Sequence, residues 1–216
     1  MILSVVIPTK NEEANIASAI RSFESYGKDV EVVVVDNYSD DNTASIAKSL
    51  GARVFTKGPE RSVQRNFGWR NASGEWLLFL DADMILPAGT IDEIFSRISS
   101  DASKDAYWIP EIRTGEGFRI KARNFERSFY NGTCIDGLRL FSRKVLEKPG
   151  GYDEELFAAE DWDLDLRVLD AHFSCDSLEG NLIHNEKSTS LRKMLSKKSY
   201  YAGSFGKYKT KWHGRK

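Results

Sequence analysis

The sequence has few cysteines and histidines, no long apolar run and no recognisable leader-peptide pattern, and each of these features argues against a class of protein. Only Cys134 and Cys175 are present, without a second cysteine or a histidine at zinc-ligand spacing, so we expect both to be reduced. The longest apolar runs, such as 32–35 and 76–80, are far shorter than the roughly 20 residues of a membrane-spanning helix. No basic stretch or small-residue cleavage site begins the chain. We therefore expect a cytoplasmic protein that does not cross a membrane.

Two common ways of holding phosphate are missing as well. The sequence contains neither the Gly-x-Gly-x-x-Gly motif of dinucleotide-binding proteins nor the Gly-x-x-x-x-Gly-Lys motif of the P-loop. A phosphate-containing ligand must therefore be held in another way.

The net charge of -1 hides an uneven distribution of charge. Ten of the 31 basic residues lie in the segment 187–216, which has no aspartate or glutamate. The preceding 186 residues keep 21 basic and 32 acidic residues. The sequence thus consists of an acidic body and a basic tail.

The first half of the sequence alternates apolar strands with helical segments. Apolar runs predict strands at 3–8, 30–35, 53–55 and 76–80, and 62–71 is one of the predicted helices between them. Hydrophobicity in these strands is continuous, which indicates burial on both faces. We therefore predict an α/β fold with a mainly parallel, doubly wound sheet and helices on both faces.

The second half has a looser pattern, without an internal repeat or a proline-rich linker. Its predicted elements are a helix at 91–98, a strand at 107–112, a charged amphipathic helix at 118–130, a strand at 138–141, a helix at 162–169, a strand at 182–184 and a basic helix opening at 191–195.

Polar residues gather where the predicted strands end, which is where open α/β sheets bind their ligands. Asp81 and Asp83 stand two apart at the end of an extended segment, so both carboxylates can face the same side. Such a pair suits Mg²⁺ or Mn²⁺, which takes one or two protein carboxylates and the oxygens of a diphosphate. An isolated Asp-x-Asp is more often a turn, and only its setting favours the metal.

Five motifs in order resemble the glycosyltransferases of family 2. They are SVVIPTKNEE at 4–13, VVVDNYSDD at 33–41, QRNFG at 64–68, LFLDAD at 78–83, and GGYDE at 150–154 followed by AEDWD at 159–163. The resemblance covers residues 3–184. It implies a GT-A fold, a UDP- or GDP-sugar donor, a divalent metal and inversion at the anomeric carbon.

The resemblance also assigns site residues. The residues that it places at the nucleotide are Pro8, Thr9, Glu12, Asp36, Arg65 and Asp81. Asp83 would be the main metal ligand, joined by His184, because a neutral imidazole is an acceptable ligand for Mn²⁺. Either Arg61 or Arg65 could fork onto a diphosphate or onto a carboxylate that follows the fourth strand. Arg65 lies inside the matched motif, and we interpret Arg61 as an ordinary surface charge.

The same resemblance places the catalytic base at Asp161. An inverting transfer needs one base to remove the proton of the acceptor hydroxyl. Glu160 and Trp162 would bind the acceptor, and Glu160 is alternatively a neighbour that adjusts the base. Without the resemblance, the acidic residues here would indicate only a helix N-terminus rich in aspartate and glutamate.

Two other classes remain to be separated from a transferase. A sugar nucleotidylyltransferase would carry a glycine-rich, Arg-Lys-containing loop after the first strand, but residues 8–13 contain no glycine. A non-catalytic nucleotide-sugar-binding module would have lost its base, but Asp83 and Asp161 are both present.

The expected organisation is one glycosyltransferase domain, 1–186, and a basic tail. Residues 1–86 would bind the nucleotide, and residues 87–186 would bind the acceptor, a glycan or a lipid-linked molecule. The tail, 187–216, mixes lysine and arginine with aromatic residues, which suits an anionic membrane surface or a solvated tail. No nucleic-acid module is recognisable, so no nucleic-acid partner is expected.

Overall fold

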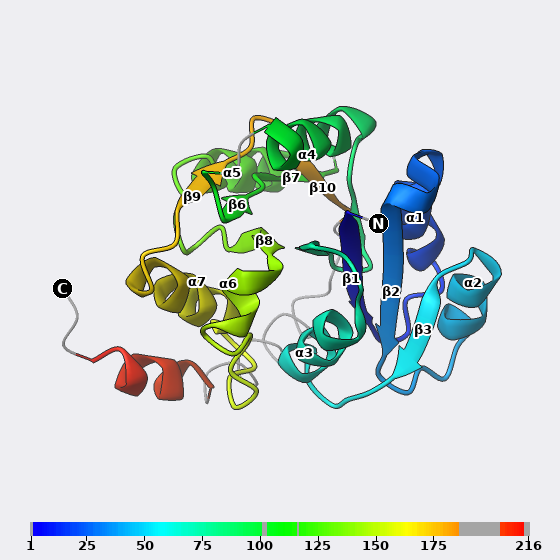
Figure 1. The fold of residues 1–216 in the computed structure, drawn as a ribbon, viewed down its shortest axis with the longest axis horizontal. Coiled ribbons are helices and arrows are strands. Elements are labelled where there is room, and N and C mark those ends of the chain that lie inside the picture. Colours follow the sequence, from blue (N-terminus) through cyan, green and yellow to red (C-terminus); the bar gives the residue numbers. More distant parts are fainter. Residues whose placement is uncertain (1, 101–102, 116, 186–203, 214–216) are drawn as a thin grey trace.

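The computed structural model describes residues 2–100, 103–115, 117–185 and 204–213 (Figure 1). In chain order its elements are β1 (Leu3–Thr9), α1 (Ile16–Arg21), the 3-10 helix η1 (Glu24–Asp29), β2 (Val30–Asp36), α2 (Thr43–Ser49), β3 (Arg53–Thr56), α3 (Arg61–Asn71), β4 (Trp76–Phe79), β5 (Met84–Ile85), α4 (Ala88–Ser100), β6 (Ala106–Trp108), β7 (Glu111–Thr114), α5 (Phe118–Arg127), β8 (Leu138–Ser142), α6 (Arg143–Glu147), α7 (Glu160–Asp170), β9 (Cys175–Ser177) and β10 (Leu182–Asn185).

The central sheet has seven strands in the order β3-β2-β1-β4-β8-β6-β9. Strands β3, β2, β1 and β4 are parallel, as the sequence predicts for the first half. Strand β8 runs antiparallel to both β4 and β6, so the second half is mixed. A smaller sheet, β5-β10-β7, lies beside it and brings the end of the described domain back to the segment that follows β4.

Each central strand contributes to two hydrophobic cores, one on each face of the sheet. In β1, Val5 packs in one core with α1 and α4, while Val6 packs in the other with α3, α6 and α7. All seven residues of β1 are buried. This alternation confirms the doubly wound arrangement, because a strand covered on both faces has no polar side.

Helix α3 packs very close to the sheet. Gly68 faces β1 and β2, and a Cβ atom at this position would collide with the side chain of Val6 and crowd Val35. The missing side chain therefore lets the helix backbone approach the strands. Gln64 and Arg65, one turn earlier, are thereby placed over the strand ends.

The single strand predicted at 107–112 is two strands in the structure, a difference that Pro110 explains. Proline has no N–H to donate to a ladder, and here it separates β6 from β7. The two strands enter different sheets, β6 beside β8 and β7 beside β10. The sequence analysis also missed β5, β9 and α6, which have only two, three and five residues.

Residues 204–211 form a helix that packs against α7. The ring of Trp162 lies edge to face with those of Phe205 and Tyr208, at centroid distances of 6.0 and 5.9 Å. Trp212 donates through Nε1 to Asp163, 3.0 Å away. The aromatic residues in this part of the basic tail therefore pack within the protein. The helix predicted to open at 191–195 lies outside the described residues.

No helix in the described ranges combines the length and the apolar character needed to cross a membrane.

Candidate active site

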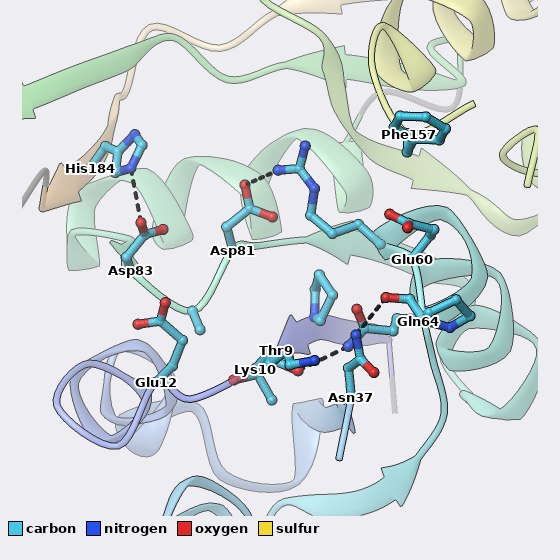
Figure 2. Close-up of a pocket in the computed structure, with 14 residues that line it drawn as sticks. Thr9, Lys10, Glu12, Asn37, Glu60, Gln64, Asp81, Asp83, Phe157 and His184 are labelled. Carbon is cyan, nitrogen blue, oxygen red and sulfur yellow. Dashed lines mark hydrogen bonds and ion pairs between the residues drawn. The ribbon is translucent and has the colours of Figure 1, made fainter. Parts of the chain in front are cut away.

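A cavity of about 340 Å³ lies at the carboxyl ends of β1, β2 and β4 (Figure 2). Its lining consists of Pro8, Thr9, Lys10, Glu12, Asn37, Pro59, Glu60, Arg61, Gln64, Asp81, Ala82, Asp83, Phe157 and His184. Six of the residues expected at the donor site are thus brought together from both halves of the sequence. The location agrees with the rule that parallel sheets bind ligands where their strands end.

Asp83 and His184 face each other on one side of the cavity (Figure 2). Nε2 of His184 lies 3.1 Å from Oδ2 of Asp83, and its Nδ1 lies 2.8 Å from Oε1 of Glu111. Burial alone would lower the pKa of the imidazole, but the two hydrogen-bonded carboxylates raise the pKa to about 9. The Glu111 side chain is 4% exposed, so it orients the ring from behind.

The donor set at this point fits a divalent cation. Mn²⁺ accepts carboxylate oxygen and neutral imidazole nitrogen, so a cation here would have to displace the proton that the raised pKa keeps on His184. Among the described residues, no group of three or more histidine, cysteine, aspartate or glutamate side chains is arranged to hold a metal ion. A cation here would therefore take few ligands from the protein and the rest from water and diphosphate oxygens, which is the usual pattern for Mg²⁺ with phosphate substrates.

Arg65 forms the other half of the site as a buried fork. Its Nη2 donates to Oδ1 of Asp81 at 2.9 Å, and its Nη1 donates to Oδ1 of Asp161 at 2.8 Å. The side chain is 1% exposed, and its Cζ lies 5.1 Å from the ring centroid of Tyr152. Arg65 was expected to bind either a diphosphate or a carboxylate after the fourth strand. The structure shows the carboxylate, which is that of Asp81.

Arg65 and Arg61 affect the pKa values of the neighbouring carboxyl groups. Burial alone would raise the pKa of Asp81, but the charges of Arg65 and Arg61 outweigh it and hold the pKa well below its usual range. Glu160 is 2% exposed, and burial together with the charge of Asp161 raises its pKa.

Arg61 lies at the surface as expected, but it also has a partner in the site. Arg61 is partly exposed, but it lines the cavity, and its Nη2 lies 3.0 Å from Oε1 of the buried Glu160. Arg61 therefore neutralises part of the acidic first turn of α7. Sequence position alone could not show this, because the partner is almost 100 residues away.

The opposite wall of the cavity presents amide, hydroxyl and carboxylate groups. Gln64 donates through Nε2 to the carbonyls of Thr9 and Val35, at 3.0 and 2.6 Å, and so joins the ends of β1 and β2. Oγ1 of Thr9 is buried and has no hydrogen-bond partner among the described residues. A ligand hydroxyl or amide could satisfy this atom. The carboxylate of Glu12 accepts from Asn15 and also lines the cavity.

Five residues assigned from the resemblance are not part of the cavity lining, namely Asp36, Arg65, Glu160, Asp161 and Trp162. Asp36 is 4% exposed, and its two carboxylate oxygens accept the backbone N–H and the hydroxyl of Ser39, so it shapes the loop after β2. Its neighbour Asn37 lines the cavity instead. Trp162 packs on Phe205 and Tyr208.

Sequence reasoning gave no role to several residues of the site. Asn37, Gln64 and Tyr152 lie inside the quoted motifs, so their polar or aromatic character was a signal that could have been used. Glu111 and Phe157 have no local signal, because only the fold brings Glu111 to His184 and Phe157 to the cavity.

Comparison with known proteins gives matches in sequence. The sequence model described as glycosyl transferase family 2 matches residues 4–150. An uncharacterized glycosyltransferase of Rickettsia typhi is 29% identical over 206 residues, which cover 95% of this chain and 67% of the relative. A GalNAc(5)-diNAcBac-PP-undecaprenol beta-1,3-glucosyltransferase of Campylobacter jejuni is 31% identical over 106 residues, which cover 44% of this chain and 34% of the relative.

The fold also matches solved structures. A mannosyltransferase from Pyrobaculum calidifontis, solved in complex with GDP-Man and Mn²⁺, superposes with a TM-score of 0.72 and 19% identity. The match covers 94% of this chain and 62% of that chain. It confirms the GT-A fold expected from the motifs. The matched regions span between 34 and 67% of the lengths of these three proteins.

Proposed function

Because this chain belongs to glycosyl transferase family 2, we propose that it moves a sugar from a UDP- or GDP-sugar to an acceptor hydroxyl with inversion at the anomeric carbon. Residues 1–86 would hold the donor, and residues 87–186 would hold the acceptor. The solved neighbour with GDP-Man and Mn²⁺ supports a nucleotide sugar and a divalent metal. The Campylobacter relative is named for an undecaprenol-linked compound, which supports a lipid-linked molecule as an acceptor in addition to a free glycan.

One observation supports this proposal above the others, namely that two acidic sites of different character flank Asp81. On one side, Asp83 meets His184 and opens into the cavity. On the other side, Arg65 binds Asp81 and Asp161 together. Transfer from a diphosphate to a hydroxyl requires a cation site and a carboxylate base, and here the carboxylate of Asp161 is held by Arg65 at a distance from the Asp83–His184 pair.

The chain's residues would divide the work of transfer. Asp161, whose side chain is 34% exposed, would accept the proton of the acceptor hydroxyl while its oxygen attacks the anomeric carbon. Arg65 is a positioning residue that holds one oxygen of this base. Asp83 and His184 would hold the divalent cation, Mg²⁺ or Mn²⁺, which when bound supplies charge to neutralise the departing diphosphate. Thr9, whose hydroxyl has no hydrogen-bond partner in the part of the chain that the structure describes, would bind the nucleoside.

A product assay tests the proposal. The protein is incubated with a panel of UDP- and GDP-sugars, Mn²⁺ and acceptors, and the released nucleotide is identified. We expect nucleoside diphosphate. A parallel incubation with added pyrophosphate in place of the acceptor tests the alternative, because formation of nucleoside triphosphate and sugar 1-phosphate would identify a nucleotidylyltransferase. Donor binding without release across the acceptor panel would identify a binding module.

A further inference from the structure

Helix α5 turns its aromatic side chains toward solvent. Phe118 and Phe125 are seven residues apart and so share one face of the helix, and Phe129 follows in the hydrogen-bonded turn after it. These three side chains are 84%, 68% and 67% exposed. The rings of Phe125 and Phe129 pack edge to face with their centroids 5.0 Å apart. A cluster of exposed aromatic rings on one helix marks an interaction surface.

The side of α5 that meets the protein combines the partly buried Ile120 with polar side chains. Asn124 donates to the carbonyl of Arg113 and accepts its N–H, at 2.9 and 3.0 Å, and so fixes α5 to β7. Arg127 pairs with Asp136 at 2.8 Å and with Glu111 at 3.4 Å. The three phenylalanines are therefore not what holds the helix in place.

The polar face also connects α5 to the candidate active site. Glu111, which receives Arg127 from α5, is the carboxylate that orients His184. Helix α5 is thus linked to Asp83 through two intermediate residues, Glu111 and His184. A surface bound by this helix would be beside the cavity.

The charge of α5 favours one occupant of its aromatic face. The sequence FRIKARNFER has four basic residues and one acidic residue, and the side chains of Lys121 and Arg123 are exposed. A second copy of this helix would bring like charges together, and so would the segment 187–216, which has ten basic and no acidic residues. An anionic bilayer complements the charge, and phenylalanine on a basic helix is typical of interfacial binding.

We propose that α5 docks the protein on an anionic membrane surface through Phe118, Phe125 and Phe129, with Lys121 facing the lipid headgroups. The inference rests on the proposed function for its meaning, because a membrane-docked transferase would take a lipid-linked acceptor. It assigns membrane contact to α5 instead of to the helix at 204–211, whose aromatic residues pack on Trp162.

Co-sedimentation with vesicles tests the inference. The protein should pellet with vesicles of phosphatidylcholine and phosphatidylglycerol and remain in solution with phosphatidylcholine alone. The double variant Phe125→Ser/Phe129→Ser should bind at least about tenfold more weakly, because each lost ring removes a large apolar area from the bilayer. Lys121→Glu should weaken binding to the anionic vesicles, and added salt should have the same effect. Tyr38→Ser, which removes an aromatic ring that is 67% exposed in the loop after β2, should bind as the parent does.

Three results would overturn the inference. The first is that the parent protein pellets with neither kind of vesicle. The second is that the phenylalanine variant pellets as the parent does. The third is that sedimentation velocity shows a dimer for the parent and a monomer for the phenylalanine variant, which would make α5 a self-association surface. Calorimetric binding of UDP and GDP with Mn²⁺, measured on the same proteins, separates this failure from that of the proposed function. The phenylalanine variant should keep the parent's nucleotide affinity, and a parent that binds neither nucleotide would contradict the donor site instead.

Discussion

Nη1 of Arg65 lies 2.8 Å from Oδ1 of Asp161, so a side chain of α3 holds the first turn of α7. The same guanidinium binds Asp81 through Nη2 at 2.9 Å. Because the donors of a guanidinium lie in one rigid plane, the two carboxylates keep their separation before any ligand is present. The separation of Asp81 from Asp161, the base in our proposal, is therefore already set in the free protein.

Replacing Arg65 with lysine should test this role. Lysine keeps the charge but cannot bind both carboxylates as a planar fork. We expect kcat to fall by about ten- to a hundredfold through misplacement of the base, with the KM for the donor little changed. Arg70→Lys, in an exposed position on the same helix, is the matched control. Equal kcat values for the Arg65→Lys protein and the parent would show that the fork does not position the base.

Asp161→Asn should keep donor binding and lower kcat by roughly two to four powers of ten, the usual contribution of a general base. The exchange is nearly isosteric, and the amide oxygen can still accept from Arg65. Single-turnover kinetics and donor titration would measure the two effects separately, with Asp170→Asn at the other end of α7 as the control. If donor affinity fell and turnover of bound donor stayed normal, Asp161 would be a binding residue.

Asp83→Ala should remove the effect of Mn²⁺ on nucleotide binding and leave the fold intact. The Asp83 side chain is 34% exposed and belongs to neither hydrophobic core. We expect the Mn²⁺-dependent affinity for UDP or GDP, measured by calorimetry, to fall by more than about tenfold, since even outer-shell changes at metal sites cost 10- to 100-fold. Asp29→Ala, before β2 at the opposite end of the sheet, should bind as the parent does. An unchanged metal effect would contradict the assignment of Asp83.

Glu31 should make the stability of the protein depend on pH. It is a buried carboxylate in β2 that accepts from Ser4 at 2.6 Å and from the backbone of Ser73 at 2.7 Å. Burial alone would raise the pKa of Glu31, but these hydrogen bonds and Arg53 lower the pKa below its usual value. Because the folded pKa is the lower one, the stabilisation is complete above the unfolded pKa of about 4.3 and is lost as the pH falls through the folded pKa.

Urea denaturation at a series of pH values measures this effect. The free energy of unfolding of the parent should fall as the pH drops below about 4.3. Glu31→Gln should be less stable by about 1–3 kcal/mol at neutral pH and should lose less on acidification. Glu24→Gln, in an exposed position, should follow the parent. A pH dependence in Glu31→Gln as steep as in the parent would assign the acid sensitivity to other groups.

The first half of the fold was predictable because its signals are local. Continuous apolar runs fix β1, β2 and β4, and the polar residues after them must meet when the strands are parallel. The second half was less predictable because its strands are short and enter two sheets. Pro110 divides one predicted strand, and the two residues of β5 give no periodic signal.

The candidate site divides in the same way. Asp81 and Asp83 follow a strand, and their place in the cavity was expected from that position. The partners of Arg65 could not be read from its surroundings in sequence, since Asp161 is 96 residues away. The pairing of Arg61 with Glu160 was not predicted for the same reason, because burial of Glu160 is a property of the assembled helix α7.

Gly68 has a consequence that reaches beyond packing. A methyl group at this position would act as a wedge between α3 and the strands under it, because Val6 already occupies the space. The helix would tilt, and both Gln64 and Arg65 would swing away from the strand ends together. The absence of a Cβ atom at Gly68 thus sets the position of two side chains relative to the sheet. They are Gln64, whose amide joins β1 to β2, and Arg65, whose guanidinium holds Asp161. Catalytic alignment would be lost at Gly68 by a change that touches no polar group at all.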